Sequence, residues 1–246
     1  MHVLGIDVGG SGIKGAVVDI ATGTLVTEKL RLPTPDGARP DDIAMVVKEI
    51  VGQLNWSGKI GIGFPSLIIN GVALIAANID SSWVGLNVVE LFSNATGCPV
   101  VVVNDADAAG IAEMTYGTGK AYQKGVVLFL TLGTGIGSAF FVNGHLFPNT
   151  ELGHLEVRGK DAEKRASAAV RTEKNLGWKE WAERLQEVLA KMEMLFSPDV
   201  IILGGGVSKN SDKFLPYLNL RAKVIPAQLR NDAGIIGAAL FASRQG

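Results

Sequence analysis

Glycines and polar side chains that suit phosphate chemistry come early in the chain. The stretch "VLGIDVGGSGIKGAVVDI" holds Gly10, Gly12 and Gly15 in a G-x-G-x-x-G spacing, and Glu28 lies near the position of an acidic ribose ligand. A dinucleotide site requires a helix to begin at these glycines. The β-branched residues and the turn that follow predict a second strand instead. We therefore expect a hairpin, and not a nicotinamide site.

The tip of this predicted hairpin offers backbone N–H groups, a hydroxyl and an ammonium to phosphate oxygens. The residues concerned are Gly9, Gly10, Ser11, Gly12 and Lys14. The stretch is not a P-loop, because Lys14 follows Ile13 and no Gly-Lys-Ser/Thr opens a helix. Asp7, at the end of the first strand, is suited to a Mg²⁺ shell. A tight hairpin with a purely structural role is the alternative.

A second segment resembles the first in its order of elements. "TLGTGIGS", residues 131–138, also follows an apolar strand, and the strand after it leads to an Asn-Gly turn. Two matching strand–loop–strand segments predict an internally duplicated architecture with a phosphate-type hairpin in each half. Two such halves that face one another would form a cleft for a ligand.

A polar corner follows the buried strand over 99–103. In "VVVVNDAD", Asn104 and Asp105 come directly after that strand, where ligand-facing residues of α/β sheets are found. The carboxylate of Asp105 has the chemistry of a general base. The alternative is that Asp105 or Asp107 only caps the helix that follows.

A third polar cluster, "ELGHLE", contains Glu151, His154 and Glu156. Carboxylates accept hydroxyl protons and an imidazole donates or accepts, so the set suits a polyhydroxylated ligand. Zinc is a competing ligand, although the spacing fits no standard zinc motif. A solvated turn is the third interpretation.

The segment "RGKDAEKRASAAVRTEK" is rich in lysine and arginine. It predicts either the solvated face of a helix or a track for an extended polyanion. The whole chain of 246 residues has a formal net charge of −1, which gives no general reason to expect nucleic-acid or membrane partners. Its one cysteine, Cys98, excludes a disulfide framework and a cysteine zinc site. The beginning "MHVLGID" lacks the features of a signal peptide, so we expect a cytoplasmic protein.

Alternating apolar runs and helical periodicity predict an α/β protein that positions these groups. Helices are expected over residues 40–54, with Asp41 or Asp42 as cap, over 178–196, and over 231–242. The apolar face of the second helix is expected to include Trp178 and Leu195. Strands are expected over 3–7, 15–20, 24–32, 59–66, 99–103 and 199–204, and as a three-strand unit within 125–147.

Taken together, these motifs resemble the ROK family of sugar kinases, and within it the polyphosphate glucokinase branch. The resemblance is carried by "GIDVGGSGIKG", "ANIDSSW", "VVNDADAAG", "TLGTGIGS", "ELGHLEVRGKDAEKRAS" and "IILGGGVSK". It implies an actin-like ATPase (ribonuclease H-like) fold, duplicated, with two domains around a cleft. The expected domains are a small one, residues 1–104 completed by the helix 233–246, and a large one, residues 105–232.

The resemblance also implies roles for single residues. Asp105 would be the base that takes the proton of a glucose 6-hydroxyl, and the sugar contacts would be Asn78, Asn104, Glu151, His154 and Glu163. The transferred phosphate would contact Gly9 to Gly12, Lys14, Thr131, Gly133, Thr134 and Gly135, and a nucleotide would lie beside Gly204, Gly205 and Gly206. Mg²⁺ would be held indirectly through Asp7. In the basic segment, Lys160, Lys164 and Arg165 form a candidate polyphosphate track.

The resemblance implies glucose as acceptor, polyphosphate or ATP as donor, and a homodimer. The cysteine-rich zinc motif of many ROK kinases is missing after His154, so no structural zinc is expected. Alternatives are an ATP-dependent kinase for mannose or an N-acetylhexosamine, a sugar-sensing repressor, and an actin-like structural ATPase. The first hairpin begins by residue 7, which leaves no DNA-binding segment before it in this sequence and favours an enzyme.

Overall fold

The computed structural model of the chain describes residues 1–76 and 79–245. It divides into two compact units, unit 1 (Met1–Ala112 with Asp232–Gly246) and unit 2 (Glu113–Asn231). The sequence analysis expects the boundary of the first domain at residue 104. Helix α3 (Asp105–Thr115) begins after that point, yet most of it belongs to unit 1. The reason is packing, because Gly237 near the C-terminus lies directly against the backbone of Ala108.

Unit 1 contains one larger sheet with helices on both faces. Its strands are β1 (His2–Gly9), β2 (Gly12–Asp19), β3 (Thr24–Leu25), β4 (Leu30–Leu32), β5 (Ile60–Phe64), β6 (Ile68–Ile69), β7 (Val72–Ala73) and β8 (Val100–Asn104). Its helices are α1 (Pro40–Gln53), α2 (Val88–Thr96), most of α3, α7 (Ala233–Arg244) and the 3₁₀ turn η1 (Ser81–Trp83). The turn η6 (Arg230–Asp232) leads into α7.

The order of strands in this sheet is β3-β2-β1-β5-β8, with β4 also paired to β2. β1 and β2 form an antiparallel hairpin, while β1, β5 and β8 run parallel. The carboxyl ends of the three parallel strands therefore meet at one edge of the sheet. Asp7 and Asn104, both singled out from the sequence, lie at that edge.

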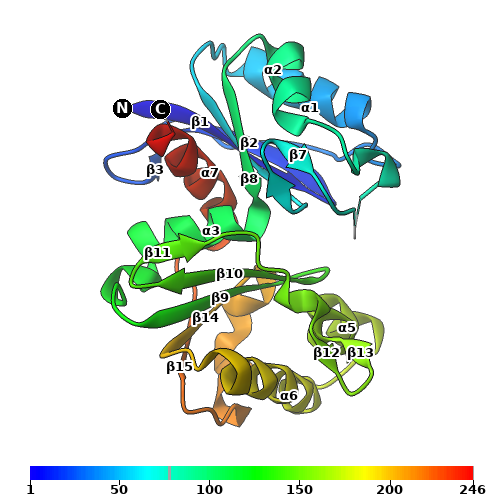
Figure 1. Cartoon of the computed structure of the whole chain (residues 1–246), viewed down its shortest axis with the longest axis vertical. Helices are drawn as coiled ribbons and strands as arrows, with labels where there is room; N and C mark the ends of the chain where they lie inside the picture. Colours follow the sequence, from blue (N-terminus) through cyan, green and yellow to red (C-terminus); the bar gives the residue numbers. More distant parts are fainter. Residues whose placement is uncertain (77–78, 246) are drawn as a thin grey trace. The chain divides into compact units, whose positions relative to one another are not determined.

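Small residues let helices approach the sheet of unit 1 on both faces (Figure 1). A Cβ added at Gly5 would lie 2.0 Å from the carbonyl oxygen of Ile235 in α7, and one at Gly15 would lie 2.6 Å from Ile50 in α1. Gly15 is paired with Ile6, the neighbour of Gly5. Because neighbouring residues of a strand point to opposite faces, α7 and α1 cover opposite sides. The core beneath α1 and α2 includes Phe64, Trp83 and Phe92.

Unit 2 repeats the strand arrangement of unit 1. Its strands are β9 (Val126–Leu132), β10 (Ile136–Val142), β11 (His145–Phe147), β12 (Glu156–Val157), β13 (Lys160–Asp161), β14 (Val200–Gly204) and β15 (Lys223–Pro226). The sheet order is β11-β10-β9-β14-β15, again an antiparallel hairpin followed by two parallel strands. The duplication predicted from the two hairpins is confirmed.

The helices of unit 2 pack on one face of its sheet. They are α4 (Ala162–Ala166), α5 (Ala168–Glu173) and α6 (Trp178–Phe196), with 3₁₀ turns η2 (Thr118–Ala121), η3 (Leu152–His154), η4 (Gly206–Lys213) and η5 (Leu215–Tyr217). Helix α6 buries Trp181, Leu185 and Leu189 against alternate residues of β9 and β14. Leu195, expected on this face, is 48% exposed. Within the described residues, no helix combines the length and apolar composition of a membrane span.

Three expectations about local structure are wrong. Helix α1 begins after Arg39, and neither aspartate caps it. Asp41 and Asp42 lie in its first turn, where their negative charges interact favourably with the positive end of the helix dipole. Residues 24–32 form two short strands, β3 and β4, because the chain bends between its two places on β2. The basic segment does not form one helix, since Ser167 ends α4 and caps α5 through the N–H of Val170.

Candidate active site

The first glycine segment is a hairpin with a two-residue turn. Gly9 pairs with Gly12, so that Gly10 and Ser11 form the exposed tip between β1 and β2. The predicted hairpin is confirmed, and no helix starts at the G-x-G-x-x-G spacing. Such a tip carries backbone N–H groups to which phosphate oxygens bind.

Two residues that the sequence analysis did not single out hold the tip in place. The Arg31 guanidinium donates to the carbonyl of Ser11 at 2.8 Å, and the Thr34 hydroxyl donates to the carbonyl of Gly9 at 2.5 Å. A Cβ at Gly12 would lie 2.8 Å from Nε of Arg31. Glycine at this position therefore lets the guanidinium lie against the backbone of the hairpin. No motif marks Arg31 or Thr34, because both come from a different segment.

Asp7 lies between a lysine and the start of a helix. It faces Lys14 across the hairpin, and Nζ of Lys14 is 3.0 Å from Oδ2 of Asp7. A Cβ at Gly234, in the first turn of α7, would be 2.9 Å from Cγ of Asp7. The carboxylate is thus stabilised by an ammonium and by the positive end of a helix. Both charged groups lie just below the hairpin tip.

Asn104 caps helix α3. Its Oδ1 accepts the N–H groups of Ala106 at 2.9 Å and Asp107 at 3.0 Å, while its Nδ2 donates to the carbonyl of Ser66 at 3.2 Å. The Ser66 hydroxyl in turn donates to the carbonyl of Ile75 at 2.6 Å. Asn104 therefore ties the loop after β5 to the first turn of α3 and caps that helix.

Asp105 is the first residue of α3. Its Oδ1 accepts the N–H of Ala106 at 2.8 Å, and part of the residue remains accessible, whereas Asp107 is fully buried. Accessibility is a requirement for a group that takes a proton from a bound substrate. Of the two aspartates at this corner, Asp105 is the one that meets it.

The segment "ANIDSSW", in which the resemblance implies a sugar contact, is described only in part. Asn78, expected as a sugar contact, lies outside the described residues. Asp80 caps η1 by accepting the hydroxyl and the N–H of Ser82, and these bonds lower the pKa of its carboxyl. The buried Trp83 that follows donates to the carbonyl of Ala38 at 2.7 Å. The loop is therefore anchored to the core of unit 1 just after Asn78.

The second glycine hairpin has no acid–lysine pair across its strands like that of Asp7 and Lys14. Thr131 pairs with Gly137 and Leu132 with Ile136, which leaves Gly133, Thr134 and Gly135 as the loop. The N–H of Gly133 donates to the carbonyl of Gly135 at 3.0 Å, and the carbonyl of Gly133 accepts the N–H of Ala169 in α5 at 3.1 Å. The loop is thus fixed both internally and by the helix that follows the basic segment.

The glycine run after β14 lies against the base of this hairpin. Gly204 is the last residue of β14, and Gly206 opens η4. Gly205 has a φ of 80°, and a Cβ there would lie 2.3 Å from the carbonyl oxygen of Leu132. Only glycine satisfies both conditions, so that the backbone of β14 can turn beside the second hairpin.

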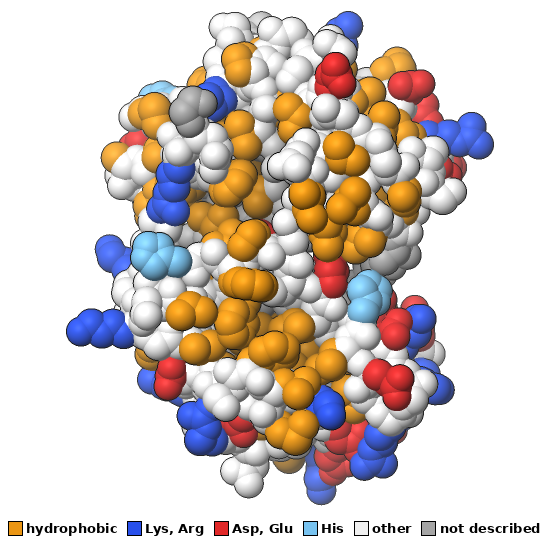
Figure 2. Space-filling model, in the orientation of Figure 1, with side chains coloured by type: hydrophobic (Ala, Val, Ile, Leu, Met, Phe, Trp, Pro, Cys, Tyr) orange, Lys and Arg blue, Asp and Glu red, His pale blue; other side chains and the backbone are white. Residues whose placement is uncertain are grey.

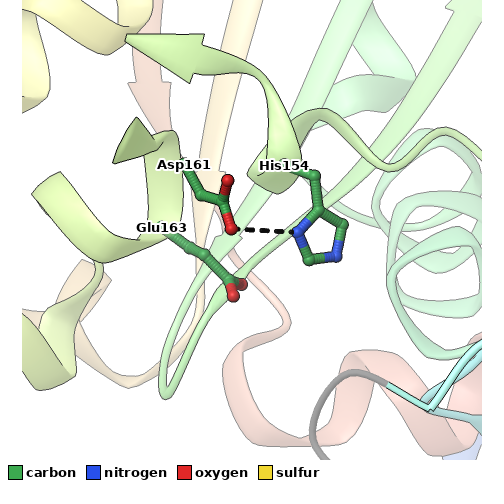
Figure 3. Close-up of side chains that lie close together, drawn as sticks. All are labelled: His154, Asp161 and Glu163. Atoms are coloured by element: carbon green, nitrogen blue, oxygen red, sulfur yellow. Dashed lines mark ion pairs between the residues drawn. The ribbon is translucent and has the colours of Figure 1, made fainter. Parts of the chain in front are cut away.

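Glu151, His154 and Glu163 lie together in unit 2, with a residue that the sequence analysis did not single out. Nδ1 of His154 is 3.6 Å from Oδ2 of Asp161 (Figure 3). The N–H of Ile136 in β10 donates to Oε2 of Glu163 at 3.4 Å. Gly153 permits this approach, since a Cβ there would be 2.2 Å from the carbonyl oxygen of Ile136.

The carboxylate that faces His154 is thus Asp161, while Glu156 is exposed in β12. One ligand atom each of His154, Asp161 and Glu163 lies within 4.8 Å of the others, a spacing that a metal ion would allow. Oδ2 of Asp161 also binds the ammonium of Lys164 at 3.0 Å. Because a cation already balances this carboxylate, we interpret the cluster as an ion-pair network and assign no zinc to it.

The pKa values of Glu151 and Asp161, two carboxyls near His154, shift in opposite directions. Burial raises the pKa of Glu151, the nearby His154 lowers it in part, and Glu163 adds to the rise. The hydrogen bond from Lys164 lowers the pKa of Asp161, with a smaller contribution from His154. Asp161 therefore stays ionised, while Glu151 takes up a proton more readily than an ordinary glutamate.

The candidate polyphosphate residues come from two adjacent elements of unit 2. Lys160 belongs to β13, and Lys164 and Arg165 belong to α4. In Figure 2, the region where Figure 1 shows β12, β13 and α5 carries charged side chains of both signs and few hydrophobic ones. Lys164 pairs with Asp161, and Arg165 pairs with Glu187 of α6.

Comparison with known proteins agrees with this fold. Residues 3–170 and 157–245 match the ROK family. The chain therefore belongs to the ROK family, whose sugar kinases have the actin-like ATPase fold with two domains. It is 47% identical over 240 residues to a polyphosphate glucokinase of Mycobacterium tuberculosis, covering 97% of this chain and 90% of the relative.

Solved structures give the same result. An inorganic polyphosphate/ATP-glucomannokinase from Arthrobacter sp. strain KM is 48% identical with a TM-score of 0.96, covering 100% of this chain and 99% of that one. A ROK family glucokinase from Streptomyces griseus, in complex with glucose and AMPPNP, is 25% identical with a TM-score of 0.82 and full coverage of both chains.

Proposed function

We propose that this protein is a glucokinase that transfers the terminal phosphoryl group of inorganic polyphosphate or ATP to the 6-hydroxyl of glucose. The observation that carries the proposal is the 47% identity, over nearly the whole chain, to proteins named polyphosphate glucokinase. The two glycine hairpins, the accessible Asp105 and the cluster around His154 supply the groups that such a reaction needs.

The two hairpins bind the phosphoryl group that is transferred. Phosphoryl transfer depends on positioning and on neutralising charge more than on covalent chemistry by the protein. Backbone N–H groups of residues 9–12 and 133–135 donate to the phosphoryl oxygens, and Lys14 adds a positive charge. Arg31 and Thr34 keep the first hairpin in shape, so that little reorganisation is needed when the donor binds.

A magnesium ion fits this donor set, in the limited sense that one carboxylate is available. Mg²⁺ commonly binds through one or two carboxylates, several waters and substrate phosphates. Asp7 lies below the hairpin tip, and Lys14 binds only one of its two oxygens. The ion would neutralise charge on the donor phosphates. Asp7 would hold it through water.

Asp105 acts as the general base. Its carboxylate accepts the proton of the glucose 6-hydroxyl while the oxygen forms a bond to phosphorus. The bond from phosphorus to the bridging oxygen breaks, and ADP or a polyphosphate shortened by one unit leaves with that electron pair. Asn104 positions the base by capping α3, and the second N–H of its amide is suited to donate to the sugar.

Glu151, His154 and Glu163 bind the remaining hydroxyls of the sugar. A sugar that lacks one of these hydroxyls would leave a half-buried carboxylate without its hydrogen-bond partner. Such a sugar is therefore bound less tightly. Asp161 orients the imidazole through Nδ1, which directs Nε2 toward a ligand. Mannose is a second candidate acceptor, since the structurally similar Arthrobacter enzyme is named a glucomannokinase.

A donor-by-acceptor assay tests this proposal. Glucose 6-phosphate is measured with polyphosphate and with ATP, each with and without Mg²⁺, and with mannose and glucosamine as alternative acceptors. We expect glucose to be phosphorylated by at least one donor in a Mg²⁺-dependent manner. Failure of every combination would contradict the kinase assignment. Cytoplasmic location and a homodimer stay predictions, of which the second is testable by sedimentation.

A further inference from the structure

Unit 2 contains a pocket lined only by cationic side chains. It has a volume of about 270 Å³, and its lining residues are Lys160, Lys164, Arg165, Lys174 and Arg184. They come from β13, α4, the end of α5 and α6. The sequence analysis singled out three of them, whereas Lys174 and Arg184 reach the pocket only through the packing of α5 and α6.

Acidic neighbours compensate only part of this charge. Lys164 pairs with Asp161, Arg165 with Glu187, and Arg184 with Glu180 at 3.0 Å, and none of these acids lines the pocket. Among the ion pairs of the described residues, none involves Lys160 or Lys174. Like charges gathered in this way repel one another unless an anion binds between them.

Arg165 supplies a further reason to expect a ligand. Its side chain is only 19% exposed, and its Nε is buried without a hydrogen-bond partner, although its Nη2 binds Glu187. A buried donor of a charged group is costly when unpaired. The guanidinium of this pocket-lining residue therefore keeps hydrogen-bonding capacity that Glu187 does not use.

The geometry points to a binding site for a linear chain of phosphates. This site binds phosphate units of the polyphosphate donor other than the terminal one that is transferred. The inference rests on the proposed function and extends it. A sugar or a nucleobase would require apolar or aromatic lining, and the pocket has none. Single-stranded nucleic acid is also disfavoured, because its sites normally combine positive charge with stacking aromatic rings.

The pocket and the second phosphate hairpin are connected by a short segment. The chain that carries Lys164 and Arg165 continues directly into α5, where the N–H of Ala169 donates to the carbonyl of Gly133 in the hairpin. Glu163, next to Lys164, accepts the N–H of Ile136 on the other side of that hairpin. The same segment therefore contacts the hairpin and carries two of the cations of the pocket.

The test compares the double variant Lys174→Ala/Arg184→Ala with Lys124→Ala/Lys179→Ala. The control removes two exposed lysines of unit 2 that do not line the pocket. Glu180 remains 56% exposed when Arg184 is removed, so no acid is left buried. KM is measured for long-chain polyphosphate and for ATP, and binding of fluorescently labelled polyphosphate is followed by anisotropy at several salt concentrations.

We expect the KM for polyphosphate to rise about tenfold in the pocket variant, with a shallower salt dependence of binding, while the KM for ATP stays within about twofold. The control should resemble the wild type. Equal losses with both donors, no difference from the control, or equally tight binding of single-stranded RNA would overturn the inference. If the wild type phosphorylates no sugar, the proposed function fails, and the anisotropy measurement still tests the pocket.

Discussion

The two glycine hairpins share a backbone design and differ in charge. In unit 1, the register of β1 and β2 places Asp7 opposite Lys14, and Arg31 binds the tip from outside. In unit 2, the corresponding pair at the base of the loop is Thr131 and Gly137. This loop is held by backbone hydrogen bonds and, at Ile136, by the carboxylate of Glu163. The duplicated fold thus supplies two phosphate-type turns, and the first carries an acid–lysine pair on its own strands.

The polar side chains near the two hairpins differ in type. Unit 1 adds the accessible carboxylate of Asp105, held by the Asn104 cap. Unit 2 adds Glu151, His154 and Glu163. These groups can hydrogen-bond to several hydroxyls of one ligand. In the proposed function, unit 1 therefore contributes the base and unit 2 the groups that bind the sugar hydroxyls.

Removal of the base in unit 1 should have the largest effect. Asp105→Asn keeps the shape of the side chain but cannot accept the proton, so we expect kcat to fall by about 10²–10⁴. The melting temperature should stay close to that of the wild type. Asp41→Asn, at an exposed acid of α1, is the matched control. Turnover of Asp105→Asn near that of the control would show that the base is another group.

The charge difference between the hairpins can be tested by one substitution in each. Lys14→Met removes the ammonium beside the donor, and hydrogen bonds to charged groups are worth about 1.5–3 kcal/mol, so KM for the donor should rise about tenfold or more. Thr131→Val removes a neutral hydroxyl at the base of the second hairpin and should cost clearly less. Kinetics with ATP and with polyphosphate provide the measurement. Equal effects in the two hairpins would contradict the comparison.

The smallest expected effect concerns the pH dependence of sugar binding in unit 2. Burial raises the pKa of Glu151 above its ordinary value of 4.5, so the carboxylate that accepts sugar hydroxyls is lost at a higher pH than usual. We expect kcat/KM for glucose to fall as the pH drops through this raised pKa. Glu151→Gln should flatten that part of the profile and lower affinity. Glu156→Gln, at an exposed neighbour, is the control. An identical acid limb in Glu151→Gln would exclude Glu151 as its source.

Local signals were strong enough to predict several elements correctly. The apolar periodicity of residues 178–196 gives helix α6 with the same bounds, and the β-branched run after Gly15 distinguishes a hairpin from a dinucleotide turn. These predictions succeed because periodicity and turn chemistry act over a few residues. The basic segment was harder, since Ser167 divides it into two helices, and a polar residue inside a basic run gives only a weak sign of a cap.

The sequence by itself determined the order of the motifs, the hairpin form of both glycine segments and the corner at Asn104 and Asp105, because each depends on neighbouring residues. The tertiary structure adds that Arg31 and Thr34 hold the first tip, that Asp161 faces His154, and that Lys174 and Arg184 complete a cationic pocket. These contacts join residues of different elements of the fold. They follow from how strands pair and helices pack, which no local pattern of residue types records.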